Sequence, residues 1–177
     1  LAAELLVESG FDVTGIDARA VTAPFKTKAV DLSDAAALKD ALSGQEAVLS
    51  CLPYHLNIGV STVAHGLGLH YFDLTEDVPT TKHIRELAKT SKGIMAPQCG
   101  LAPGFVGIVA ADLAGQFDSV RSIKLRVGAL PQHPTGLLGY AFNWSPEGVV
   151  NEYLNDCEVI EEGVLKNVSA MEWTETI

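Results

Sequence analysis

Basic residues are scarce in this chain of 177 residues. Lysine and arginine together number 12 against 22 aspartates and glutamates, which gives a formal net charge of -10 and an isoelectric point near 4.8. A charge of this sign repels the phosphates of nucleic acids and the anionic surface of a lipid bilayer. We therefore expect neither nucleic acid nor a membrane as a partner.

Long hydrophobic runs and paired cysteines are also missing. The apolar segments 46–52 and 105–111 are far shorter than the roughly 20 residues that a membrane-spanning helix needs. Three widely spaced cysteines, Cys51, Cys99 and Cys157, are typical of a reducing compartment, so we expect free thiols and a cytoplasmic location. The five histidines do not cluster with cysteines or carboxylates at zinc-ligand spacing, and we expect no metal site.

The sequence contains no GxGxxG motif, the glycine-rich turn that receives the pyrophosphate of a dinucleotide at a helix N-terminus. The first ten residues, LAAELLVESG, predict a helix that ends at Gly10. In a dinucleotide-binding fold, a strand and the glycine-rich turn come before this helix. We therefore expect the chain to be truncated at its N-terminus.

Strand and helix patterns alternate over residues 1–118. Several strand-like runs are apolar throughout, which favours a parallel sheet covered by helices on both faces. We therefore predict an α/β fold with a Rossmann-like doubly wound parallel sheet. The expected strands are 11–17, 29–32, 46–52, 69–74 and 93–98; the expected later helices are 33–44 with Ser33 as N-cap, 57–67, 79–92 with Asp77 as N-cap, and 105–117.

The pattern changes after residue 118. Apolar and polar residues alternate over 123–129, which predicts a half-exposed, antiparallel strand. A loop at 131–136, an aromatic strand at 140–144, a helix at 146–154 and a hairpin turning at Glu162 and Gly163 complete the pattern. Residues 119–177 are therefore predicted to begin an α+β domain for substrate binding and dimerisation.

Asp17 ends the second strand of the expected fold. A carboxylate at this place can accept hydrogen bonds from both hydroxyls of the adenosine ribose, although aspartate is also an ordinary strand terminus. The surrounding fold favours the ribose contact. Arg19 could meet a 2'-phosphate, but Asp17 would repel that phosphate, so we predict NAD as the cofactor, with NADP as the alternative.

Three further strings carry polar groups at predicted strand ends. Tyr54 of CLPY follows a buried strand, where open α/β sheets bind ligands, though an isolated Pro-Tyr pair more often only packs. Asp73 and Glu76 of YFDLTED are candidates for a general base, because neighbouring carboxylates raise each other's pKa. Cys99 of CGLAPG lies near a helix N-terminus, which can lower a thiol pKa, but a small inert thiol is the more frequent outcome.

The strings CLPY, YFDLTED and CGLAPG, followed by RVGALPQHP and SPEGVVNEY, resemble the saccharopine dehydrogenase family and in particular its lysine 6-dehydrogenase-like members. The resemblance runs over nearly the whole chain. It implies a nicotinamide-dependent oxidoreductase that acts on the C–N bond of an amino-acid side-chain amine. It also implies that the chain is truncated at both ends, and that the fragment alone can be inactive.

The resemblance also implies roles for individual residues. Tyr54, Asp73 and Cys99 match the positions of active-site polar groups in this family. The resemblance therefore favours a functional role for these three residues over a purely structural one. The cofactor contacts would come from Asp17, Arg19, Asp31 near the adenine, and the loop Cys51, Leu52 and Pro53. The substrate contacts would come from Glu76, Glu147 and Asn151.

The implied mechanism keeps the substrate amine neutral with a general base, for which Asp73 is the candidate, while hydride leaves the adjacent carbon. Water then adds to the imine, and Tyr54 or Cys99 helps to move protons. Two alternatives stay open: a noncatalytic dinucleotide-binding sensor, and a relative that acts on a carboxyamine, such as a carboxyspermidine dehydrogenase. An extended sheet in the second domain predicts a homodimer of the complete protein.

Overall fold

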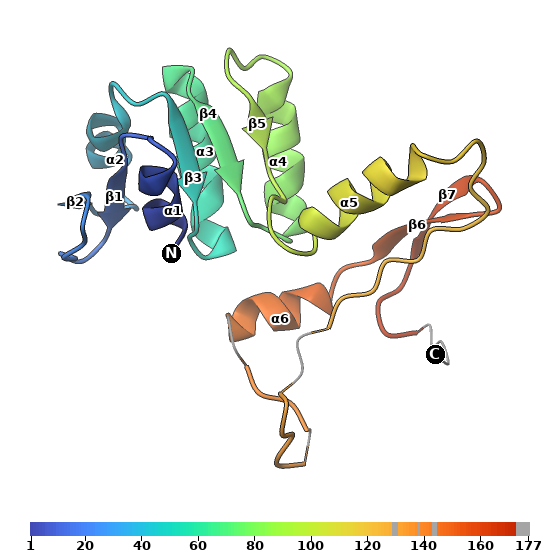
Figure 1. Ribbon diagram of the computed structural model, residues 1–177. Coiled ribbons are helices and arrows are strands. Elements are labelled where there is room, and N and C mark those ends of the chain that lie inside the picture. The colour runs from blue at the N-terminus through green and yellow to red at the C-terminus, as the bar shows by residue number, and fades with distance from the viewer. Residues whose placement is uncertain (129–130, 138, 143–144, 173–177) are drawn as a thin grey trace.

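The structure is a computed structural model that describes residues 1–128, 131–137, 139–142 and 145–172 (Figure 1). Helices and strands alternate over residues 1–118, here called the first part of the chain, as the sequence predicts, and residues 119–177 are called the second part. The elements are α1 (Ala2–Glu8), β1 (Thr14–Asp17), β2 (Lys26–Ala29), α2 (Ala35–Leu42), β3 (Ala47–Ser50), α3 (Tyr54–Leu67), β4 (His70–Asp73), α4 (Val78–Ala88), β5 (Met95–Ala96), α5 (Phe105–Ala114), α6 (Pro146–Glu152), β6 (Cys157–Glu161) and β7 (Val164–Val168).

All strand pairs of the first part are parallel, so the predicted α/β class is confirmed. β1 pairs with β2, and β3, β4 and β5 form a second sheet in that order. A doubly wound sheet has the strand order 3-2-1-4-5-6. In that numbering β1 and β2 correspond to strands 2 and 3, and β3, β4 and β5 correspond to strands 4, 5 and 6. The register places Ser50 beside Asp73, so the last residues of β3 and β4 lie together at one edge of the sheet.

The core lies between the three-stranded sheet and the layer of α2, α3 and α4. α3 packs against α2 on one side and α4 on the other, and it also contacts β3 and β4. Apolar residues recur at helical spacing on α2 and α4, which presents one face of each helix to the sheet. The buried apolar cluster consists of Leu38, Leu42, Val60, Ala64, Leu69, Tyr71, Ile84 and Met95.

Two predicted boundaries are wrong near the start of α2. β2 ends at Ala29 instead of beginning there, because its register pairs Ala29 with Asp17 at the end of β1. The N-cap of α2 is Asp34 instead of Ser33: the Asp34 carboxylate accepts hydrogen bonds from the amides of residues 36 and 37 at 2.8 and 3.2 Å. The Ser33 hydroxyl does not cap the helix, since it donates a hydrogen bond to Asp31 at 2.6 Å.

The second part of the chain departs further from the prediction. Residues 123–128 form no strand. Alternating apolar and polar residues suit the two faces of a strand, but a strand also needs a neighbouring strand to accept and donate its hydrogen bonds. Residues 140–142 also form no strand, and residues 129, 143 and 144 lie outside the described residues. The hairpin is confirmed: β6 and β7 are antiparallel, and both Glu162 and Gly163 have the positive φ of a tight two-residue turn.

α6 lies against the first part of the chain. It starts at Pro146, with Ser145 as its N-cap, and it lies beneath the edge of the sheet where α3 and α4 begin (Figure 1). α3 begins at Tyr54, three residues earlier than predicted, and this places the Tyr54 ring in the first turn of the helix. Tyr54 and α6 therefore lie on opposite walls of one opening.

Candidate active site

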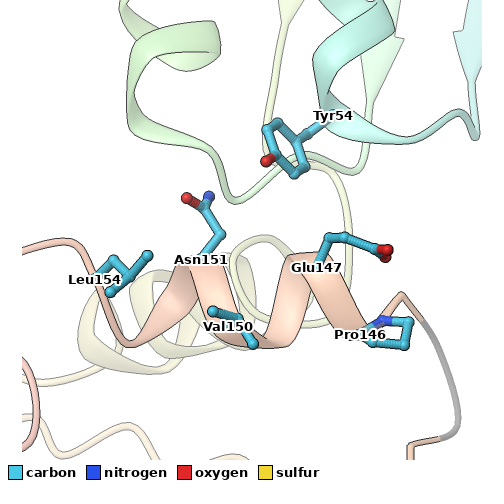
Figure 2. A pocket seen from close by; sticks show the side chains of 6 residues that line it. All are labelled: Tyr54, Pro146, Glu147, Val150, Asn151 and Leu154. Atoms are coloured by element: carbon cyan, nitrogen blue, oxygen red, sulfur yellow. The ribbon is translucent and has the colours of Figure 1, made fainter.

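A cavity of about 370 Å³ separates Tyr54 from α6. Figure 2 shows the Tyr54 ring directed toward α6 and the Asn151 side chain directed back toward the sheet. The volume lies within the range of ordinary small-molecule sites. The cavity is lined by Tyr54, Pro146, Glu147, Val150, Asn151 and Leu154. Tyr54 of CLPY therefore shares one cavity with Glu147 and Asn151 of SPEGVVNEY.

Hydrogen bonds at both ends of α6 hold it in place. The Ser145 hydroxyl oxygen accepts a hydrogen bond from the amide of Gly148 at 3.1 Å, which caps the helix. Val149 is buried. Asn151 Nδ2 donates to Asp77 Oδ1 at 3.1 Å, so α6 is bonded directly to the N-cap residue of α4. This contact joins the two parts of the chain at the wall of the cavity.

Asp73 is completely buried at the end of β4 and accepts three hydrogen bonds. The Tyr71 hydroxyl donates to Oδ2 at 2.9 Å, and the amides of Thr75 and Gln98 donate to Oδ1 at 3.0 and 3.2 Å. Burial, together with the Asp73 charge and this hydrogen bond, raises the pKa of Tyr71 far above its usual value. Asp73 thus connects the β4–α4 loop with the loop that follows β5.

Cys99 follows β5 within this same arrangement. Its amide donates to the carbonyl oxygen of Asp73 at 2.7 Å, and its thiol donates to the carbonyl oxygen of Ala96 at 3.4 Å. Burial, with the Asp73 charge as a second cause, raises the pKa of the Cys99 thiol. The idea that the nearby helix N-terminus lowers this pKa is therefore wrong, because desolvation disfavours the thiolate.

Two glutamates near the cavity have raised pKa values. Burial is the main cause for Glu76, and the charges of Asp77 and Asp73 add to it. Burial also raises the pKa of Glu152 at the end of α6, and the charge of Glu76 contributes. Both carboxylates therefore hold a proton more readily than an exposed glutamate does.

We expect the substitution Glu152→Gln to stabilise the protein at about pH 7.5 by up to ~1 kcal/mol. A carboxylate whose pKa is raised by folding contributes stability below its unfolded pKa, and this contribution is lost as the pH rises through the folded pKa. The gain should therefore vanish well below pH 4.5, the ordinary pKa of a glutamate, where the side chain is protonated in both the folded and the unfolded state. Thermal unfolding at the two pH values measures it. The control Glu158→Gln on β6 should show no such difference, and a gain equal at both pH values would contradict the assignment.

A second cavity, of about 200 Å³, lies beside β1 and β2. Asp17 lines it at the end of β1, together with Gly15, Ile16, Phe25 and Lys28. The amide of Arg19 donates to Asp17 Oδ1 at 2.8 Å, and the Arg19 side chain is 90% exposed. The cavity therefore offers apolar walls and a strand-end carboxylate, and Arg19 lies beside that carboxylate without lining the cavity, with its Nε 3.9 Å from Asp17 Oδ1. The adenosine and phosphate contacts of Asp17 and Arg19 stay predictions.

The other predicted cofactor residues have distinct environments. Asp31 is exposed, and its bonds to the hydroxyl and amide of Ser33 lower its pKa. Pro53 occupies the N-cap position of α3, directly after the exposed Cys51 and the half-buried Leu52. Burial raises the pKa of the Cys51 thiol. Cofactor contacts for these four residues remain predictions, and all three cysteines are free in the structure.

The sequence does not reveal the residues that contact each other between the first and the second part of the chain. Asp77 is correctly predicted as an N-cap, but its bond to Asn151 joins residues 74 positions apart and leaves no local signal. Glu152 also carries no local signal, because the charge that acts on its pKa belongs to Glu76, which is distant in the sequence. Tyr71 carries a recognisable signal, since a buried tyrosine needs a partner for its hydroxyl and Asp73 lies two residues away on the same face of the strand.

The part of the chain that the structure describes contains neither a metal-binding cluster nor a helix fit to span a membrane. No group of three or more histidine, cysteine or carboxylate side chains in the described ranges is arranged to hold a metal ion. Within the same part of the chain, none of the helices is both long enough and apolar enough to cross a bilayer.

Family models match nearly the whole chain in two consecutive pieces. The model of the saccharopine dehydrogenase NADP binding domain matches residues 12–96, and the model of the saccharopine dehydrogenase C-terminal domain matches residues 100–177. Fold and matches together define a dinucleotide-binding α/β domain joined to a second domain. The chain belongs to the saccharopine dehydrogenase family. The division expected between residues 118 and 119 stays a prediction.

Curated relatives and a solved structure agree with this family. The chain is 27% identical over 157 residues to the NADP(+), L-glutamate-forming saccharopine dehydrogenase of Schizosaccharomyces pombe, and 26% identical over 172 residues to that of Saccharomyces cerevisiae. These matches cover 85% and 87% of the chain, but only 35% and 36% of the relatives. The chain thus spans about a third of their length.

The fold likeness extends to a solved structure. The apo histidine-tagged saccharopine dehydrogenase (L-Glu forming) from Saccharomyces cerevisiae matches with a TM-score of 0.53 at 21% identity, covering 95% of this chain and 36% of that one. At this identity the match supports the fold alone. The predicted Rossmann-like sheet, followed by residues of a second domain, is thereby confirmed.

Proposed function

We propose that this chain is part of an oxidoreductase that uses a nicotinamide dinucleotide to oxidise or form the C–N bond of an amino-acid side-chain amine. The observation that carries the proposal is the cavity between Tyr54 and α6, at the edge of the sheet where β3 and β4 end. Open α/β sheets bind their ligands at this edge. The family models support the same function, since they match the domains on both sides of the cavity.

NADP is the favoured cofactor, in place of the NAD that the sequence favours. The matching family model and the curated relatives carry NADP in their names. The residues beside β1 fit this choice, because Arg19 lies next to Asp17 and can offset its negative charge near a 2'-phosphate. The bound dinucleotide supplies the atom that accepts or donates hydride.

The residues of this chain would bind the amine and move its protons. Glu76 is the candidate that we favour for the general base, since burial raises its pKa and it precedes Asp77, which bonds to the cavity residue Asn151. Tyr54 directs its ring into the cavity, where its hydroxyl can bind or protonate the substrate. Asp73 fits a positioning role better, because both of its oxygens already accept hydrogen bonds within the chain.

The remaining substrate contacts fit a positively charged amine. Glu147 lines the cavity, and Glu152, five residues later on α6, lies outside the lining and close enough to Glu76 to respond to its charge. Saccharopine is the favoured substrate because it is named in the curated relatives, and L-lysine is the alternative that the motifs suggest. The homodimer and the cytoplasmic location stay predictions.

Turnover should appear as a change in reduced-nicotinamide absorbance when the protein receives NADP and saccharopine. Parallel assays with NAD, and with L-lysine as the substrate, separate the cofactors and the two substrates. Signal with L-lysine alone would move the protein to the lysine 6-dehydrogenase type. Dinucleotide binding without turnover on either substrate would contradict the proposed reaction and support the sensor alternative.

A matched pair of variants tests the cofactor site in the same assay. Arg19→Ala should raise the KM for NADP about tenfold and change the KM for NAD much less, because only NADP carries the 2'-phosphate. The exposed Arg121 lies outside the residues that the NADP binding domain model matches, and Arg121→Ala should change neither value. Equal effects of Arg19→Ala on both cofactors would contradict the role of Arg19.

A further inference from the structure

Asp77 uses its two carboxylate oxygens for two different partners. Oδ2 accepts hydrogen bonds from the amide and the hydroxyl of Thr80 at 2.9 and 2.6 Å, and this caps α4. Oδ1 accepts the hydrogen bond from Asn151 Nδ2 at 3.1 Å. Asp77 is only 6% exposed, so this bond is formed largely away from water. A hydrogen bond to a desolvated carboxylate is stronger than one between neutral groups.

Asn151 is also held by Asn155, which lies just beyond the C-terminal end of α6. Asn155 Nδ2 donates to the carbonyl oxygen of Asn151 at 2.8 Å and lies 3.4 Å from its side-chain oxygen. The side-chain nitrogen and the side-chain oxygen of Asn151 therefore each have one partner within the chain. Each atom keeps one further hydrogen-bonding position that a substrate could use. The contacts with Asp77 and Asn155 nevertheless give Asn151 a structural role at the wall of the cavity that does not depend on a substrate.

We propose that Asn151 is a positioning residue whose hydrogen bond to Asp77 fixes α6 at its distance from Tyr54, and thereby sets the size of the substrate cavity. The cavity has Tyr54 on one wall and only residues of α6 and its flanks on the other. A shift of α6 would therefore change its width directly. The proposal rests on the proposed function only in taking this cavity as the substrate site.

The Asp77–Asn151 bond also acts against a repulsion at the same junction. Glu76 precedes Asp77, and Glu152 follows Asn151, so each partner of the bond has a carboxylate next to it in the chain. The charge of Glu76 acts on Glu152 across the junction. Like charges at short distance push the two elements apart. The bond between Asp77 and Asn151 is the described polar contact that joins α6 to the first part of the chain at this place.

An exchange of the two side chains tests the proposal. Asn151→Asp alone places one carboxylate against another, whereas the double variant Asp77→Asn with Asn151→Asp restores the hydrogen bond with donor and acceptor reversed. Asparagine caps helices about as well as aspartate, so α4 should remain intact in the double variant. The readouts are the amide hydrogen exchange of residues 149–152 and of α4, and the KM values for substrate and dinucleotide.

Asn151→Asp should speed exchange in α6 and raise the substrate KM, each by about tenfold, while the dinucleotide KM and exchange in α4 stay within about twofold. The double variant should return both altered values toward those of the unaltered protein. Asn167→Asp on the exposed strand β7 is the matched control and should change neither.

Two outcomes would overturn the positioning role. Unchanged exchange of α6 in Asn151→Asp would mean that the bond does not hold the helix. Failure of the double variant to recover would mean that Asn151 acts by a contact other than the one with Asp77. If no variant and not even the unaltered protein turns over substrate, the proposed function fails, but the exchange measurements still decide whether the bond fixes α6.

Discussion

Replacing Asp73 by alanine is expected to destabilise the protein by about 3–5 kcal/mol. The Asp73 side chain is completely buried and accepts hydrogen bonds from the Tyr71 hydroxyl and from the amides of Thr75 and Gln98. Alanine would leave these three buried donors without their acceptor. The free energy of unfolding in urea measures the loss, and Asp118→Ala at an exposed position is the matched control.

Asp73→Asn separates a structural role from a catalytic one. The asparagine oxygen can still accept from both amides, and the Tyr71 hydroxyl can turn to accept from the new amide group, so less than half of the alanine loss is expected. If Asp73→Asn is stable and retains turnover, Asp73 positions the site. If it is stable but inactive, Asp73 is the general base after all. A fully stable Asp73→Ala protein would contradict the hydrogen-bond network itself.

Gly104→Ala is expected to cost at least ~3 kcal/mol or to prevent folding. Gly104 has φ 134° and ψ -104°, a conformation that residues with a Cβ rarely adopt. A Cβ at this position would lie 2.2 Å from the carbonyl oxygen of Gly100 and 2.8 Å from that of Gln98. Both are backbone atoms, and the Phe105 amide bonds to the same Gly100 oxygen at 2.8 Å, so they cannot easily give way.

The matched control for Gly104 lies three residues further along the chain. Gly107 is inside α5, and a Cβ there would meet no atom within 4 Å. Gly107→Ala should therefore stabilise the protein by about 0.5–1 kcal/mol, through the better helix propensity of alanine. Thermal or urea unfolding of both variants compares them directly. Equal stability of the two would contradict the tight backbone approach in the loop 99–104.

The sequence predicts the order of the first elements well because their signals are local. Asp77 as the cap of α4 and the turn at Glu162 and Gly163 depend on a few neighbouring residues, and both are confirmed. Periodicity also marks the apolar faces of α2 and α4. The strand expected at residues 123–129 is different, because alternating residues form a strand only where another strand pairs with them.

The candidate site is only partly visible in the sequence for a similar reason. Tyr54 and Asn151 can each be selected from a motif, but their common cavity depends on how α6 lies against the sheet. Asp73 attracts attention as a carboxylate at a strand end. Its saturation with hydrogen bonds arises from Gln98, which a different loop brings next to it. Contacts of this kind depend on tertiary packing and have no sequence spacing to reveal them.

The carboxylates at the junction of α6 with the β4–α4 loop also affect how a ligand arrives. Glu76 and Asp77 lie on one side of this junction, and Glu147 and Glu152 belong to the helix on the other. Negative charge gathered around an opening attracts cations during diffusional encounter. Dissolved salt screens this attraction beyond about 8 Å at physiological ionic strength. A cationic amine should therefore associate faster in dilute buffer than in concentrated salt, whereas a neutral analogue should arrive at nearly the same rate in both.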